Sequence, residues 1–346
     1  MRRFIIIRAL LLALAAAADP ATAAATPPDL PPAAQPPRAV WADCGSCWQR
    51  TEWEREIAGY HLVMLSALRD SPARVAAQEQ RGEKPLILRQ RFELRRGGQV
   101  MLDIEDRWLD PARRPDLRLP PPGTDVAGSG KPQLVLLGWS GAGDCCFTLH
   151  VIELGASPRV LARVVTQDGI PRLIQRDADP DFEIIVEDPT YAGWDLLPDT
   201  ALPRVVLKYD PQEGRYRFAA AQMRRPPPPV GRLEAEARLL HEAAADDAAK
   251  NGADDDAVEH VPGRLVRTML QLIYAGNYPM ARRFLDEAWS DGYGVTREAF
   301  LRDLMECRLP RSPYWIDIAT LNGLTPQAPR ADCAAATAAG QPGSQR

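Results

Sequence analysis

Residues 125–137 read Asp-Val-Ala-Gly-Ser-Gly-Lys-Pro-Gln-Leu-Val-Leu-Leu, a short polar, glycine-rich loop that passes directly into an apolar run. Fifty-two positions later, residues 177–186 read Asp-Ala-Asp-Pro-Asp-Phe-Glu-Ile-Ile-Val and repeat that layout. Loops rich in oxygen-bearing side chains can wrap an ion, and short apolar runs bounded by turn residues are typical of buried strands. Two copies of one unit predict a β domain built from repeats.

Short apolar runs of this kind recur through residues 123–222. Many short strands at close spacing predict an antiparallel β architecture. Because two or three repeats are too few to close a large propeller, we expect a partial, propeller-like assembly. The runs centre on Leu134–Leu137, Phe147–Ile152, Val160–Val165, Glu183–Val186, Val205–Leu207 and Tyr216–Ala219.

The segment before these runs contains two further patterns. Apolar residues at mostly helical spacing predict a helix within residues 41–85, namely Trp53, Ile57, Tyr60, Met64 and Leu68. Residues 86–106 predict a β-hairpin that turns at Gly97-Gly98. Together with the repeats, they make residues 41–222 a mainly β domain.

The chain changes character after the four prolines at positions 226–229, which deny both a helix and a strand ladder. Residues 231–321 predict a helical subdomain: a long helix over 231–250, two amphipathic helices and a third from Arg297 to Cys307. Residues 322–346 are rich in Pro, Ala, Gly and Gln and predict a disordered tail. The fold class is therefore α+β, an antiparallel β-repeat core followed by helices. The apolar faces of the two amphipathic helices consist of Leu265, Met269, Leu272 and Ile273 in the first and of Phe284, Leu285, Ala288 and Trp289 in the second.

The first 40 residues predict export. Residues 1–23 combine a cationic start, an apolar run and a small-x-small site at Ala21–Ala23, the three parts of a secretory signal peptide. Residues 24–40 are rich in Pro and Ala and predict an extended linker. We expect a periplasmic or secreted protein without stable membrane insertion. The chain has a net charge of −4, which argues against a basic surface that could bind nucleic acid.

The cysteine count is even, which in an oxidising compartment predicts disulfide bonds without fixing their pairing. Three alternatives remain open. Cys44-Gly-Ser-Cys47 has the spacing of a thiol–disulfide redox motif, the Cys145-Cys146 doublet could be a redox switch, and these four thiolates could hold zinc. The six cysteines are Cys44, Cys47, Cys145, Cys146, Cys307 and Cys333.

The loops resemble FG-GAP/VCBS repeats of integrin α-chain heads and secreted bacterial proteins, in which an Asp-x-Asn/Asp-x-Asp-Gly loop coordinates calcium before a hydrophobic strand. Residues 125–135, with Ser140-Gly-Ala-Gly-Asp-Cys-Cys146, more narrowly resemble uncharacterised exported bacterial proteins that have a Cys-Cys segment. Asp144 stands where that group has a histidine. The resemblance covers about residues 123–222 and implies a fold and a compartment, but no activity.

The second loop is the candidate calcium site, because its four carboxylates stand at alternate positions. Pro180 and Phe182 replace the usual small residues and stiffen the loop. The alternative is a solvated acidic turn whose aspartates cap backbone amides. The first loop has a single carboxylate, Asp125. The candidate ligands are Asp177, Asp179, Asp181 and Glu183.

Other chemistry has little support in the sequence. The four histidines show no metal-ligand spacing, and neither a Gly-x-Ser-x-Gly elbow nor a phosphate-binding loop is present. Residues 274–288 are similar to part of a tetratricopeptide repeat, but a single copy favours a helical hairpin packed on the β domain. The histidines are His61, His150, His241 and His260.

We therefore expect a non-catalytic binding or structural module that recognises an envelope protein or a glycan, with no cofactor other than calcium. The first rival is an envelope hydrolase that uses Asp177, Asp179 or Glu187 in a cleft between the two parts. The second rival is a thiol–disulfide redox protein. Carboxylates of perturbed pKa in a pocket would favour the hydrolase, and reducible, exposed cysteines would favour the redox protein.

Overall fold

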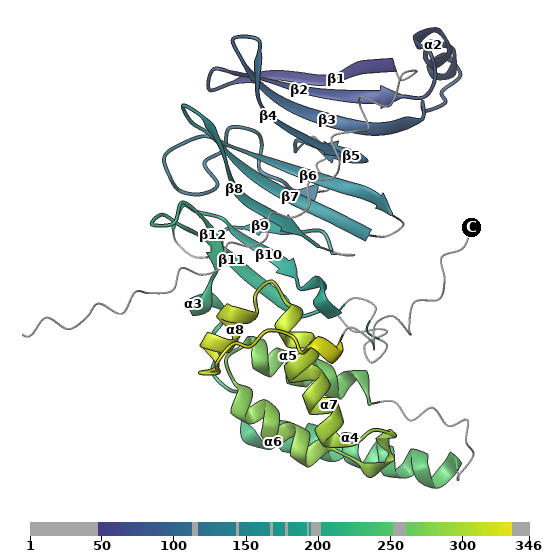
Figure 1. The fold of residues 1–346 in the computed structure, drawn as a ribbon, viewed down its shortest axis with the longest axis vertical. Coiled ribbons are helices and arrows are strands. Elements are labelled where there is room, and N and C mark those ends of the chain that lie inside the picture. The colour runs from purple at the N-terminus through teal and green to yellow at the C-terminus, as the bar shows by residue number, and fades with distance from the viewer. Residues whose placement is uncertain are drawn as a thin grey trace, which may run out of the picture. The chain divides into compact units, whose positions relative to one another are not determined.

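The computed structural model describes residues 48–112, 117–142, 145–166, 169–176, 179–191, 194, 202–251 and 261–333 (Figure 1). The predicted signal peptide and linker lie outside these residues. The described residues form three four-stranded antiparallel sheets and seven α-helices, which confirms the α+β class. The described strands close neither a barrel nor a propeller ring.

Each sheet is a meander, in which every strand pairs with the next strand of the chain (Figure 1). The first sheet contains β1 (Trp48–Ile57), β2 (Tyr60–Leu68), β3 (Ile87–Arg96) and β4 (Gln99–Asp106). The second contains β5 (Trp108–Asp110), β6 (Gln133–Ala142), β7 (Cys145–Leu154) and β8 (Pro158–Val165). The third contains β9 (Arg172–Ile174), β10 (Glu183–Glu187), β11 (Arg204–Asp210) and β12 (Arg215–Phe218). All six predicted strand centres and the hairpin over 86–106 are confirmed.

The helix predicted from Trp53 to Leu68 is wrong, because these residues form the β1–β2 hairpin. A spacing of four residues fits a helix turn, but it is also a multiple of the strand period of two. Tyr60 and Met64 therefore share one face of β2. The chain reverses at Ala58-Gly59, where both residues have positive φ (51° and 75°), as a tight hairpin turn requires.

The run Leu134–Leu137 in β6 explains how the layers are joined. Successive side chains of a strand point to opposite faces, so Leu134 and Leu136 enter one core and Val135 and Leu137 enter another. The first core lies between the first and second sheets and includes Phe92 of β3. The second core joins the second sheet, the third sheet and the helices (Figure 1).

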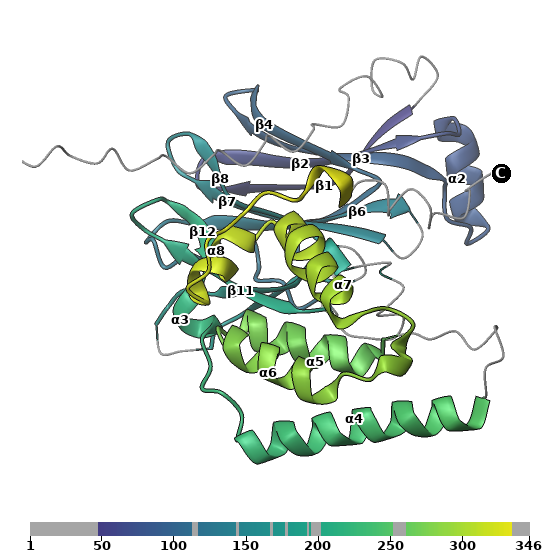
Figure 2. The same ribbon diagram turned by 60° about the horizontal axis from the view of Figure 1, so that its bottom comes forward.

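The helical part confirms the predicted long helix and both amphipathic helices. These are α4 (Val230–Asn251), α5 (Gly263–Tyr274) and α6 (Tyr278–Ala288), and α6 contacts both others (Figure 2). The third predicted helix is α7 (Arg297–Arg302), which continues as a π-helical segment, Asp303–Arg308. The remaining helices are α2 (Pro72–Gln80), α3 (Ala220–Met223) and α8 (Trp315–Leu321).

A buried carboxylate ties the third sheet to the helices. Asp188, directly after β10, accepts hydrogen bonds from the Tyr274 hydroxyl (2.6 Å), the Ser312 hydroxyl and the Thr190 amide (2.9 Å). Asp188 is fully buried, so these donors supply the stabilisation that water would otherwise give. Burial, together with the Asp188 charge, raises the pKa of Tyr274, which keeps the phenol a donor.

Cys307 and Cys333 form a disulfide bond that holds the end of the described chain on the helices. Trp315 assists by donating its indole N–H to the Gln327 carbonyl at 3.0 Å. Cys146 is also disulfide-bonded. Cys44, Cys47 and the side chain of Cys145 lie outside the described part of the chain.

No helix in the described ranges has the length and apolar character needed to span a bilayer.

The closeness of the sheets predicts the effect of a substitution at Gly138. A Cβ at this position of β6 would lie 2.5 Å from Oδ2 of Asp106 and 3.3 Å from Cδ2 of Leu109. We expect Gly138→Ala to lower the free energy of unfolding by about 1–3 kcal/mol, measured by urea denaturation. Gly155→Ala is the control, because its Cβ would meet nothing closer than 3.6 Å. Equal effects of the two changes would contradict this packing.

Candidate functional site

The two repeated loops occupy the same place in successive sheets and lie beside each other. The loop over residues 125–131 precedes β6, the second strand of its sheet, and the loop over 177–181 precedes β10, the second strand of the next. The Phe182 amide donates to the Val126 carbonyl at 2.8 Å. A Cβ at Gly128 would lie 3.3 Å from Cβ of Asp181, so the missing side chain permits this approach.

The first loop uses its polar groups internally. Asp125 accepts hydrogen bonds from the amides of Ser129 (3.0 Å) and Gly130 (2.7 Å), one on each carboxylate oxygen. The Gln133 side chain accepts from the Val126 amide (2.6 Å) and donates to the Ser129 hydroxyl (2.9 Å). Asp125 therefore caps its own turn, the alternative to an ion ligand.

The second loop meets a lysine from a different strand. The Lys208 ammonium of β11 pairs with Asp179 and lies 3.5 Å from Oδ1 of Asp181. Glu183 is fully buried at the start of β10 and accepts from the Arg176 amide at 3.1 Å. Lys208 thus supplies a positive charge at the carboxylates where the sequence predicts calcium.

Calcium binding at this loop stays a hypothesis. Within the described residues, no three His, Cys, Asp or Glu side chains are grouped as a metal centre. Asp177, the first candidate ligand, lies outside those residues. Asp179 and Asp181 are brought together, and Glu183 stands two positions further along the chain.

Crowding perturbs the titration of Asp181. Burial, reinforced by the neighbouring Asp179 carboxyl group, raises the pKa of Asp181 to about 6, against the opposing effect of Lys208. Both carboxylates lie beside the Lys208 ammonium, and the negative charge of Asp179 disfavours ionisation of Asp181. Tyr216 lies close by and donates to the Val126 carbonyl at 2.9 Å, and burial raises the pKa of its phenol.

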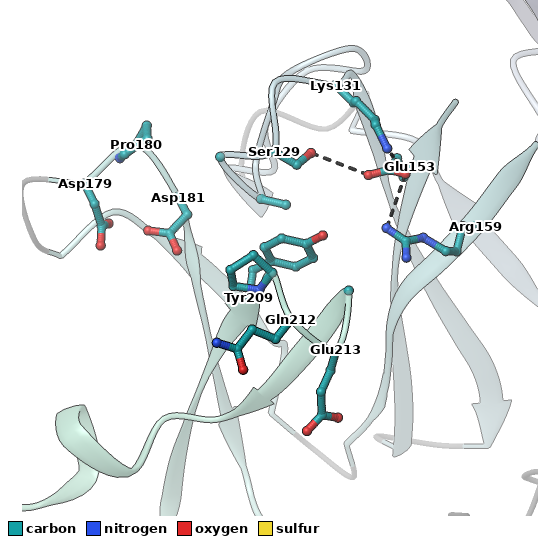
Figure 3. Close-up of a pocket in the computed structure, with 14 residues that line it drawn as sticks. Ser129, Lys131, Glu153, Arg159, Asp179, Pro180, Asp181, Tyr209, Gln212 and Glu213 are labelled. Atoms are coloured by element: carbon teal, nitrogen blue, oxygen red, sulfur yellow. Dashed lines mark hydrogen bonds and ion pairs between the residues drawn. The ribbon is translucent and has the colours of Figure 1, made fainter. Parts of the chain in front are cut away.

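A cleft of about 640 Å³ opens between the two loops and the turn that joins β11 to β12 (Figure 3). Asp179 and Asp181 line one side. Glu153 of β7 and Arg159 of β8 line the other, and the Tyr209 ring extends between the two sides (Figure 3). Polar and apolar groups line the cleft in similar measure, and several of the polar groups are charged, which suits a small hydrophilic ligand.

Glu153 organises the side of the cleft opposite the aspartates. Its carboxylate is buried and accepts hydrogen bonds from Lys131 Nζ (2.9 Å) and Arg159 Nη2 (3.3 Å). The Ser129 hydroxyl lies 3.5 Å from the other oxygen (Figure 3). The side chains of Lys131 and Arg159 remain about half exposed, at 52% and 48%. This side therefore presents two accessible cations on one buried anion.

Five residues at or beside the cleft carry no motif that predicted them from the sequence: Lys131, Glu153, Arg159, Lys208 and Tyr209. One signal was present: Glu153 and Arg159 flank a short turn and are direct cross-strand partners, a favourable opposite-charge pair. Lys208 gave no comparable signal, because its partners are 29 and 27 positions earlier in the chain.

The other candidate residues lie elsewhere. Glu187 does not line the cleft and stands 3.8 Å from Arg204. His61 stands 3.4 Å from Glu54, and Nδ1 of His241 is 2.7 Å from the Trp289 carbonyl oxygen. Burial lowers the pKa of His150 to about 4, so this side chain is neutral at physiological pH. His260 is outside the described residues.

Comparisons of the chain with models of known families, with curated proteins and with solved structures find no match.

The raised pKa of Asp181 predicts a pH-dependent effect of Asp181→Asn. The folded protein holds this proton more tightly than the unfolded chain, so ionisation costs folded-state stability as pH rises from about 4 to about 6. We expect Asp181→Asn to raise the free energy of unfolding, and more at about pH 7.5 than at about pH 4.5. Urea denaturation at both values is the measurement, with the exposed Asp103→Asn as control. A loss of stability at the higher pH would show that the Lys208 pair outweighs the cost of burial.

The calcium prediction has a direct test. Because Lys208 already supplies a cation to Asp179 and Asp181, we expect calcium at about 1 mM to leave the melting temperature unchanged. A bound ion at a hundred times its dissociation constant would stabilise the fold by about 2.7 kcal/mol. A calcium-dependent rise in the wild-type protein that disappears in Asp179→Ala would instead make residues 177–183 a calcium site.

Proposed function

We propose that this chain is an exported, non-catalytic binding module and that the cleft between the two repeated loops is its ligand site. The observation that carries the proposal is the composition of the cleft. Its charged groups come from both loops, from the β7–β8 hairpin and from the β11–β12 turn, and they face a common polar space. Convergent polar groups in a concave site are typical of ligand binding.

The pairing of the carboxylates favours binding over catalysis. Glu153 is held by Lys131 and Arg159, and Asp179 and Asp181 share Lys208. Glu213, on the rim, pairs with Arg215 at 2.9 Å and also with Arg217. A general base must reach its substrate with an available lone pair, and a nucleophile needs an activating neighbour. Glu153, Asp179 and Glu213 are instead paired with neighbouring cations, and Asp181 lies 3.5 Å from one.

A hydrolase is the second candidate, and one observation favours it. The pKa of Asp181, at about 6, lies in the range of a general acid or base, and Asp181 lines the cleft. If the protein is a hydrolase, the wild-type protein should hydrolyse a bound ligand and the Asp181→Asn variant should not. A binding module predicts recovery of the ligand chemically unchanged from both proteins.

The architecture we propose is an open stack of propeller-like blades. Support comes from three consecutive meanders of identical strand order, from the shared cores between neighbouring sheets and from the equivalent position of the two loops. Export is supported by the N-terminal sequence and by the Cys307–Cys333 disulfide bond, which suits an oxidising compartment. An envelope protein or a glycan fragment presenting small polar groups would suit the cleft.

A bulky residue on the rim of the cleft tests the binding function. Gln212 lies in the exposed β11–β12 turn and lines the cleft, so Gln212→Trp should fill the space without disturbing a core. The mature protein would be screened by thermal shift against sugars, amino acids, short peptides, polyamines and organic acids. We expect at least one class to raise the melting temperature of wild type and of the exposed control Gln99→Trp, but not of Gln212→Trp. Equal shifts in all three proteins would place the ligand elsewhere.

A further inference from the structure

We propose that the ligand of the cleft is a small organic acid and that its carboxylate binds between the Lys131 ammonium and the Arg159 guanidinium. This assignment rests on the proposed binding function and names its ligand class. The two side chains come from different elements, the loop before β6 and strand β8, and both line the side of the cleft that contains Glu153 (Figure 3).

Both cations bind the same oxygen of Glu153, so they stand close enough together to share a second anion. Lys131 Nζ lies 2.9 Å and Arg159 Nη2 lies 3.3 Å from Oε1 of Glu153. The two nitrogens are therefore separated by no more than the sum of these two distances. A carboxylate has two acceptor oxygens and can take a charge-assisted hydrogen bond from an ammonium and a guanidinium at once.

The two cations have donors to spare for such a ligand. Within the described residues, each donates one hydrogen bond to Glu153, whereas an ammonium has three N–H groups and a guanidinium has five. About half of each side chain is exposed. Two positive charges meet one negative charge here, and a ligand that carries a single negative charge would balance them.

The basic pair is held in place before any ligand arrives. The β7–β8 turn next to Arg159 is fixed to the first sheet, because the Tyr60 hydroxyl and the Arg96 guanidinium each donate to the Gly155 carbonyl at 2.9 Å. The Arg159 guanidinium in turn packs against Gly214, where a Cβ would overlap it. Donors that are already positioned lose less entropy when they bind.

The other acids of the cleft are directed away from this pair. The Glu213 carboxylate pairs with Arg215 at 2.9 Å and points away from Arg159 (Figure 3). Asp179 and Asp181 lie on the opposite side of the cleft (Figure 3). Their presence in the same cleft disfavours a second negative charge on the ligand, which favours a monocarboxylate over a phosphate.

Matched acids and amides test the proposal, because the members of a pair differ in charge and little in shape. The pairs are benzoate and benzamide, phenylacetate and phenylacetamide, and N-acetylglycine and N-acetylglycinamide. Two pairs have phenyl bodies because the Tyr209 ring extends into the cleft. Binding to the mature protein would be measured by isothermal titration calorimetry at low salt. In at least one pair, we expect the acid to bind about tenfold more tightly than the amide, or better.

Two substitutions locate the carboxylate. Lys131→Gln and Arg159→Gln each remove one cation and leave the other to Glu153, so each should reduce the preference for the acid by about fivefold or more. The exposed positions Lys84→Gln and Arg55→Gln are the matched controls and should keep the wild-type preference. The conservative variant Arg159→Lys, which retains the charge, should keep part of it. Melting temperatures without ligand check that every variant is folded.

Four outcomes would overturn the carboxylate assignment. They are equal binding of acid and amide in every pair, no binding of any acid, a preference that persists in both cleft variants, and tighter binding of phenylphosphonate than of every carboxylate. If another solute class still shows a shift that Gln212→Trp abolishes, the binding function survives and only its ligand class is wrong. If no class does, the binding function fails with it.

Discussion

Strand β6 is the element on which the rest of the structure depends, because each of its faces enters a different hydrophobic core. Leu134 and Leu136 join the first sheet to the second, and Val135 and Leu137 join the second sheet to the third. All four side chains are almost fully buried, and each such burial stabilises the fold by about 1.5–3 kcal/mol. The same strand follows the first repeated loop, so the packing of the layers also fixes where that loop lies.

The third sheet and the helices share one hydrophobic core, so the two parts of the chain pack as a single unit. The second core runs from Val135 through Ile184 to Leu272 and Phe284 without interruption. Asp188 adds a buried polar anchor at the same junction through the Tyr274 hydroxyl. A hydrogen-bonded carboxylate in such a place fixes one relative orientation, since any other arrangement would leave a buried charge without donors. The helical part therefore serves as a support for the third sheet and its loop.

The charged side chains of the cleft come from loops and strands of two neighbouring sheets. One loop satisfies its carboxylate, Asp125, with its own backbone amides, whereas the next loop directs Asp179 and Asp181 at a lysine of another strand. Across the cleft, the single carboxylate of Glu153 pairs with two cations, Lys131 and Arg159. Which charged side chains line each side of the cleft is therefore decided by which strands and turns the meanders bring together.

The sequence by itself determined the class of the fold, the strand centres from Leu134 to Ala219 and the three principal helical segments, because these follow from local periodicity and turn residues. It also located the repeated loops. It failed at Trp53–Leu68, where a four-residue spacing fits both helix and strand, and only the buried faces of a sheet decide between them. The pairing of Lys208 with Asp179 and Asp181, and of Glu153 with Lys131, was decided by tertiary structure alone, since such contacts depend on the order and stacking of strands far apart in the chain.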